Sequence, residues 1–233
     1  MPDRTRQDYV LSFYRVRQAL GLLGLVFPVL LLLGGWLENA RVQPSISDYY
    51  HTTLRDIYVG TLFAIGIFLV SYKGHVRENG ERLSDNLAAT LAGVGAFGLA
   101  VFPNQVVPGT KNIFEFFLGE YAKWGHFVAA VLFLGAMAYL SLVKFARSGK
   151  PARRRIYRLC GWAILLFGGA ATLFSILRAW TSLGWSDTIE SSGIIFWFEA
   201  LGIWAFGISW LTKGQADIAL LRGLEKIRLR RRH

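Results

Sequence analysis

Apolar residues are grouped along this chain in six runs, which short polar or basic stretches separate. The runs are 16 to 22 residues long. An α-helix rises about 1.5 Å per residue, so the longer runs can cross the roughly 30 Å hydrocarbon core of a membrane. The pattern predicts an all-α membrane protein with a bundle of six transmembrane helices. The predicted spans are residues 18–37, 57–72, 86–102, 124–143, 159–177 and 191–212.

The segments outside the spans are polar and mostly basic. Residues 1–17 combine arginines with apolar side chains and predict a basic amphipathic segment on the membrane surface. Residues 103–123 are rich in phenylalanine and predict an interfacial loop or short helix, and residues 144–158 predict a strongly basic loop. The predicted organisation is therefore the N-terminal segment, a transmembrane domain over 18–212, and a basic C-terminal helix or tail over 213–233.

The third run has a face of small residues. Ala88, Ala92 and Ala96 recur at four-residue spacing, which lets a neighbouring helix approach closely. Several glycines in the second and third runs are expected to make room between helices in the same way, namely Gly60, Gly66, Gly93, Gly95 and Gly98.

Composition and charge support a membrane location and predict its orientation. The chain is 53% hydrophobic with a mean hydropathy of +0.37 and a net charge of +11. The termini and the loops after the second and fourth spans hold 21 of the 26 lysines and arginines, so the positive-inside rule predicts that both termini are cytoplasmic, in a plasma or inner membrane. Basic clusters at a membrane favour anionic inner-leaflet headgroups as partners rather than nucleic acid. The predicted contacts are Arg153, Arg154, Arg155, Arg230, Arg231 and Arg232.

Metal-binding and nucleotide-binding patterns are missing from the sequence. Cys160 is the only cysteine, which excludes an intrachain disulfide and a thiolate metal site. The sequence has no HxxxH, HExxH or CxxC spacing, no GxSxG and no phosphate-binding GxxxxGK. The expectation is therefore no metal cofactor; zinc held by His, Asp and Glu side chains is the alternative.

The stretch from Pro44 to Asp56 concentrates polar chemistry between the first two spans. It includes Asp48, His51 and Asp56. Six spans place this stretch in the outer half of the membrane domain, together with three polar residues of other segments, Asn104, His126 and Glu199. We therefore predict an outward-facing polar cavity with Glu199 as its floor, covered by residues 44–56 and 103–123.

Each of these residues also has a simpler interpretation. Asp56 at a helix start can satisfy free backbone amides and the helix dipole. His126 beside a tryptophan can be an interfacial residue, and His51 can be solvated in its loop. Glu199 lies so deep that its carboxylate needs a partner, which a hydrogen bond between helices would supply.

Five short motifs resemble the Frag/DRAM family of six-span membrane proteins, which includes a protein of GPI-anchor lipid remodelling. They are SISD at 45–48, SYKG at 71–74, FPN at 102–104, GHFVAA at 125–130 and FEALGIWAFGISWL at 198–211. The resemblance implies a six-helix bundle with Asp48, His126 and Glu199 at its polar positions, and a connection with lipids. Tyr49 and Tyr50 depart from the small residues that relatives often have after the aspartate.

The expected function is to bind or handle a lipid, in lipid remodelling or membrane organisation. One alternative is a metal-dependent intramembrane lipid hydrolase, and another is a proton-coupled transporter or channel in which Glu199 titrates. Whether the protein is an enzyme stays open. The predicted ligand-binding residues are Ser47, Asp48, Asn104, His126 and Glu199. The predicted supporting residues are His51, Asp56, Ser209 and Trp210.

Overall fold

The computed structural model describes residues 2–39, 41–74, 83–105, 112–148, 150–180 and 185–215. These residues form helices and connecting turns, with no strand among them. Their elements are α1 (Pro2–Asn39), η1 (Ser47–His51), α2 (Arg55–Val70), α3 (Asp85–Val101), α4 (Ile113–Leu118), η2 (Gly119–Tyr121), α5 (Ala122–Tyr139), the π-helical η3 (Leu140–Phe145), α6 (Ala146–Ser148), α7 (Pro151–Trp180), α8 (Trp185–Ser192) and α9 (Ile194–Lys213). The predicted all-α class is confirmed for the part of the chain described.

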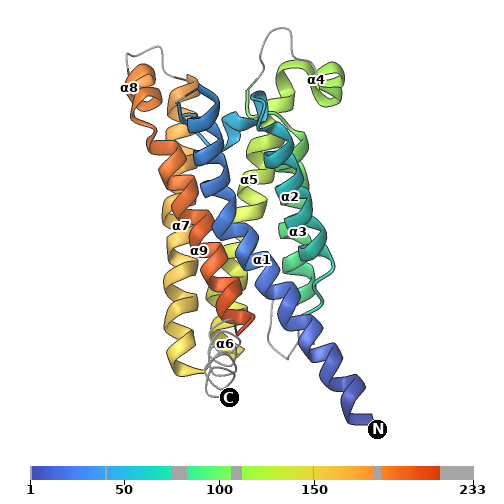
Figure 1. Cartoon of the computed structure of the whole chain (residues 1–233). Coiled ribbons are helices and arrows are strands. Elements are labelled where there is room, and N and C mark those ends of the chain that lie inside the picture. Colours follow the sequence, from blue (N-terminus) through green and yellow to red (C-terminus); the bar gives the residue numbers. More distant parts are fainter. Residues whose placement is uncertain are drawn as a thin grey trace, which may run out of the picture.

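The long helices form a closed bundle (Figure 1). Neighbours in the ring are α1, α2, α3, α5, α7 and α9, and α9 packs back against α1. Packing is most extensive within α2–α3–α5 and within α7–α9–α1, and it is thinner where α1 meets α2 and where α5 meets α7. The bundle is therefore best described as two groups of three helices that face each other.

The two ends of the bundle differ in what they hold. The upper end in Figure 1 contains η1, α4 and α8, whereas α1 begins and α9 ends at the lower end. The terms "upper end" and "lower end" are used in this sense below. The beginning and the end of the described helical bundle thus lie at the same end.

Four helical stretches are long and apolar enough to cross a membrane. They are Tyr14–Glu38, Ile113–Phe145, Pro151–Arg178 and Ile194–Lys213. The shorter α2 and α3 have 16 and 17 residues, or roughly 25 Å of helix each. Four apolar helices of this length indicate a membrane protein.

Some element boundaries differ from the prediction. Residues 2–17 belong to α1, which is continuous from Pro2 to Asn39, and their place on the membrane surface stays a prediction. The expected basic loop is helical at both ends, because η3 and α6 extend α5 and α7 begins at Pro151. Proline suits the first position of a helix, and arginine is a good helix former. The helix can therefore include the charged residues that lie outside the apolar run. Gly193 interrupts the last predicted span. Its φ of +62° is a conformation that favours glycine, and this residue separates α8 from α9. Residues 216–233 of the predicted tail, including Arg230, Arg231 and Arg232, lie outside the described residues.

Small residues of α3 let a neighbouring helix approach closely, as their spacing predicts. Ala88, Ala92 and Ala96 are at most 1% exposed. A Cβ on Gly95 would lie 2.7 Å from the backbone nitrogen of Phe133 in α5. The close approach of α3 to α5 therefore depends on glycine. Gly60 differs, since no atom lies within 4 Å of the Cβ position there.

Side chains fill the lower part of the bundle. Trp210 is fully buried among the rings of Tyr72, Phe145 and Phe206. Nearby, the buried Lys144 and Asp85 form an ion pair of 3.2 Å between η3 and α3. This packing leaves the upper half as the place where a cavity forms.

Candidate ligand-binding cavity

A cavity of about 530 Å³ lies between the two groups of helices. Its volume is within the range of small-molecule sites. Polar side chains from the 43–52 segment, α5, α7, α8 and α9 line its upper part. Its lower part is apolar and is lined by Leu62, Ile65, Phe133, Leu134, Gly202 and Phe206. The cavity is thus amphipathic along the bundle axis.

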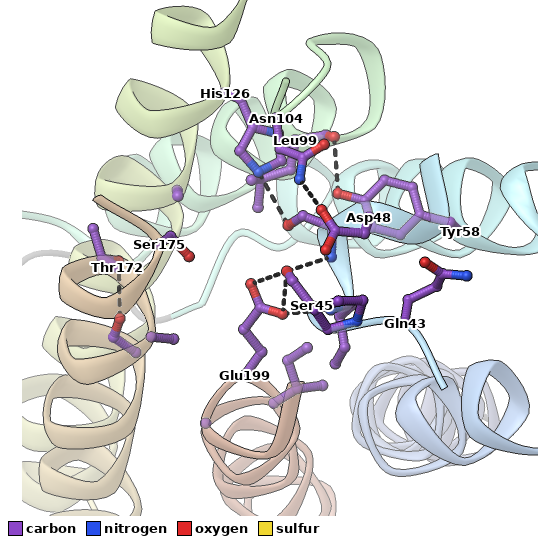
Figure 2. Close-up of a pocket in the computed structure, with 18 of the residues that line it drawn as sticks. Gln43, Ser45, Asp48, Tyr58, Leu99, Asn104, His126, Thr172, Ser175 and Glu199 are labelled. Carbon is purple, nitrogen blue, oxygen red and sulfur yellow. Dashed lines mark hydrogen bonds between the residues drawn. The ribbon is translucent and has the colours of Figure 1, made fainter. Parts of the chain in front are cut away.

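The segment Ser45–Asp48 enters the bundle and is held from two sides (Figure 2). On the α9 side, the Ser45 hydroxyl donates to the Glu199 carboxylate at 2.8 Å, and the backbone N–H of Ile46 donates to the same carboxylate. On the α5 side, the Ser47 hydroxyl lies 3.1 Å from Nε2 of His126. These contacts fix the segment as one wall of the cavity.

Asp48 is the most connected side chain of this wall. It is 5% exposed and accepts two hydrogen bonds from the Arg178 guanidinium, at 2.7 and 2.9 Å. It also accepts one from Nδ2 of Asn104 at 2.6 Å. Bidentate arginine–carboxylate pairs are among the strongest polar contacts in proteins. Asp48 therefore joins η1 to α7 and to the segment after α3.

His51 extends this network through Asn104. Its Nε2 lies 3.1 Å from Oδ1 of Asn104. Burial lowers the pKa of His51 below its ordinary value of 6.5, although Asn104 and Asp48 act to raise it. A neutral ring whose Nε2 donates to the amide oxygen follows from this environment. His51, in the short helix η1, is thus half-buried and hydrogen-bonded to Asn104.

His126 is buried, and both of its ring nitrogens have partners. Nδ1 lies 3.0 Å from the carbonyl oxygen of Phe102, and Nε2 faces Ser47. A carbonyl oxygen can only accept, so Nδ1 carries the hydrogen and Nε2 of the neutral ring accepts from the hydroxyl. His126 is therefore held by the protein on both sides of its ring.

The two tyrosines after Asp48 support the wall from behind. The Tyr49 hydroxyl accepts from the backbone N–H of Gln43 at 3.3 Å, and the Tyr50 hydroxyl donates to the carbonyl of Val101 at 3.2 Å. Both side chains are buried. Tyr49 and Tyr50 thus have a structural role in this chain.

The structure brings most of the predicted residues together. The cavity is lined by Ser47, Asp48, His51, Asn104, His126 and Glu199. It is not lined by Asp56, which is exposed in the first turn of α2, or by Ser209 and Trp210, which are buried further down α9. Ser209 instead shares a hydrogen bond of 2.8 Å with Ser141.

Glu199 is not the floor of the cavity. The lining continues along α9 to Phe206, seven residues or roughly 10 Å further down. Glu199 lies above this apolar part, at the level where Ser45 and Ile46 contact it. The partners of its carboxylate come from this segment rather than from another helix. From the predicted cover at 103–123, Asn104 and Gln105 line the cavity.

Sequence reasoning missed several lining residues, and Arg178 is the most important. Others are Tyr58, Thr172, Ser175 and Glu190. Arg178 follows the fifth apolar run directly and is the only basic residue between the last two spans. A signal was therefore available, because an aspartate expected to face the bundle interior needs a cation at the same end.

Among the described residues, no group of three or more His, Cys, Asp or Glu side chains is placed to hold a metal ion. The zinc-dependent hydrolase and the proton-coupled transporter or channel stay predictions. Metal analysis of the purified protein tests the first. The second is tested by measuring the pH dependence of flux into liposomes that contain the wild type or Glu199→Gln.

No family model matches the chain, and neither a curated protein nor a solved structure matches it. The resemblance to the Frag/DRAM family therefore stays an expectation drawn from the five motifs.

Proposed function

We propose that this is an integral membrane protein that binds a lipid in an outward-facing cavity. In this proposal α1, α2, α3, α5, α7 and α9 all cross the membrane, with the lower end in the cytoplasm. The distribution of basic residues supports the orientation, because most of the lysines and arginines among the described residues belong to lower-end segments. The short α2 and α3 fit a bilayer that thins locally around them.

The observation that carries the proposal is the amphipathic lining of the cavity. A lipid joins a polar headgroup to an apolar chain, and the cavity changes from polar to apolar over its depth. Its upper part contains three carboxyl groups, of Asp48, Glu190 and Glu199, but only the guanidinium of Arg178. This excess of acceptors favours a headgroup that donates hydrogen bonds or carries an amine.

The lower end is proposed to contact anionic headgroups of the inner leaflet. Arg153, Arg154 and Arg155 lie in the first turns of α7 at this end. Each basic residue near an anionic surface contributes on the order of 1 kcal/mol of attraction. These contacts would hold the bundle in the bilayer rather than select the cavity ligand.

Copurified lipid tests the proposal. Protein purified in mild detergent is extracted, and its lipids are identified by mass spectrometry for the wild type, Glu199→Ala and Asp56→Ala. We expect a bound lipid in the wild type and a loss in Glu199→Ala, because the Ser45–Asp48 wall loses its anchor on α9. Asp56→Ala removes an exposed carboxylate outside the cavity and should change nothing. Equal lipid content in all three folded proteins would contradict the proposal.

A further inference from the structure

Ser47 and His126 form a pair that has a chemical capacity beyond binding. The hydroxyl faces Nε2 at 3.1 Å, and Nδ1–H donates to the Phe102 carbonyl at 3.0 Å. Hydroxyl, imidazole and a third group that orients the imidazole are the parts that activate a serine nucleophile. Here the third group is a backbone carbonyl, which fixes the tautomer of His126.

The pair is accessible from the cavity. Both residues line it, and Ser47 is only partly buried. The neighbouring Ser45 is different, because its hydroxyl is buried and donates to a carboxylate. Ser47 is thus the hydroxyl of this wall that faces a nitrogen base.

Donors for a developing negative charge are held by Asp48, the residue that follows Ser47. They belong to Arg178 and Asn104. A guanidinium has five N–H donors, of which Asp48 takes two, and an amide has two, of which Asp48 takes one. The remaining N–H groups belong to residues that line the cavity. They can stabilise the oxyanion of a tetrahedral intermediate.

We propose that the cavity catalyses acyl transfer from an ester lipid, with Ser47 as the nucleophile and His126 as the general base. This inference rests on the proposed lipid binding. Ser47 Oγ attacks the ester carbonyl carbon while its proton passes to His126 Nε2. The bond from this carbon to the alcohol oxygen of the lipid then breaks, and Nε2–H protonates the departing oxygen. The acyl group remains on Ser47 as an ester.

A second alcohol or a water molecule completes the cycle. It gives its proton to His126 Nε2 and attacks the acyl carbon, and the bond to Ser47 Oγ breaks. Ser47 then recovers its proton from Nε2. The sequence needs no oxidant or reductant. The apolar lower cavity, from Leu62 to Phe206, is where the acyl chain would lie.

An alkyl fluorophosphonate tests the pair directly, since a nucleophilic serine displaces its fluoride and keeps the phosphonate. The full-length protein is incubated with the probe, and the modified peptide is located by mass spectrometry. We expect the adduct on Ser47 in the wild type, none at this position in Ser47→Ala, and a labelling rate at least about a hundredfold lower in His126→Ala. Ser191→Ala changes an exposed serine of α8 and should label as the wild type does.

Mapping the adduct in the wild type needs no variant, so the test holds even if Ser47→Ala does not fold. An unmodified Ser47, or labelling that survives unchanged in folded His126→Ala, would overturn the acyl-transfer proposal. Lipid content is measured in the same preparations. Bound lipid with an unmodified Ser47 would leave the binding function intact and remove only the catalytic one. The absence of lipid would contradict the binding function instead.

Discussion

At the scale of single residues, the ion pair between Asp48 and Arg178 determines how the upper end is held. The side chains of Asp48 and Arg178 are 6% and 14% exposed, so both charges have lost most of their hydration. A charge in this position needs its partner, because an unpaired buried ion is far more costly than a paired one. The pair is therefore both a structural link and the boundary of the cavity.

Replacing Arg178 by methionine should destabilise the protein strongly. Arg178→Met leaves the Asp48 carboxylate without its main partner, and we expect a loss of about 3–5 kcal/mol in the free energy of unfolding. Adding Asp48→Asn to this variant should recover part of the loss. Unfolding in detergent, followed by tryptophan fluorescence, measures both effects.

The matched control is the exposed ion pair between Lys123 and Glu120, whose atoms are 3.3 Å apart and whose side chains are 35% and 73% exposed. Water screens this pair, so Lys123→Met should cost less than about 1 kcal/mol. Similar costs for Arg178→Met and Lys123→Met would contradict the account of Asp48 as a carboxylate that depends on its partner.

The sequence predicted the convergence of Asp48, His126 and Glu199 because alternating helix directions place all three near one end of the bundle. It did not predict Arg178 as the partner of Asp48, since the two are 130 positions apart and a cation after an apolar run is also typical of a water-facing residue. Ser209 and Trp210 are on the same helix as Glu199, but helical rise carries them roughly 15 Å further down, where the bundle is filled.

At the scale of elements, α9 contains glycines with two different functions. A Cβ on Gly202 would meet its nearest atom, the backbone nitrogen of Gly168, at 3.6 Å, and Gly202 lines the cavity. A Cβ on Gly207 would lie 2.8 Å from the carbonyl oxygen of Gly21 in α1. Gly202 therefore leaves space for a ligand, whereas Gly207 lets two helices touch.

Leucine at each position should separate these functions. Gly202→Leu places its side chain in the cavity, so we expect a folded protein with much less bound lipid. Gly207→Leu forces α1 away from α9, and overpacking of this kind costs about 1–3 kcal/mol or more. Lipid mass spectrometry and thermal unfolding of both variants measure the two effects. A folded Gly202→Leu protein that keeps its full lipid content would show that the ligand lies elsewhere.

The positions of the long helices were predictable from the apolar runs, but the positions of their ends were less so. The apolar runs located the core of each long helix, because a membrane requires about 20 apolar residues. They did not locate the start of α7 at Pro151, because the helix begins before the apolar run does. Arginines such as Arg153–Arg155 have high helix propensity but no hydrophobicity. The break at Gly193 was also missed, because a single left-handed residue does not change the hydropathy of the run.

At the scale of the whole molecule, three asymmetries coincide. The upper half holds the cavity and the lower half is filled. The described bundle begins with α1 and ends with α9 at the lower end, where most of the described lysines and arginines also lie. Basic residues favour the cytoplasmic side of a membrane. If the lower end is cytoplasmic, the cavity takes its ligand from the outer half of the bilayer.

Cysteine accessibility tests this orientation, because Cys160 is the only cysteine and it is buried. In a Cys160→Ala background, Thr53→Cys and Glu120→Cys place a thiol at exposed positions of the upper end, and Lys150→Cys places one at an exposed position of the lower end. A membrane-impermeant maleimide added to intact cells should label the first two proteins, and it should label the third only after permeabilisation. The reverse pattern would put the cavity in the inner half, and the lipid would then come from the cytoplasmic leaflet. Because the two patterns exclude each other, the experiment decides which leaflet the cavity serves.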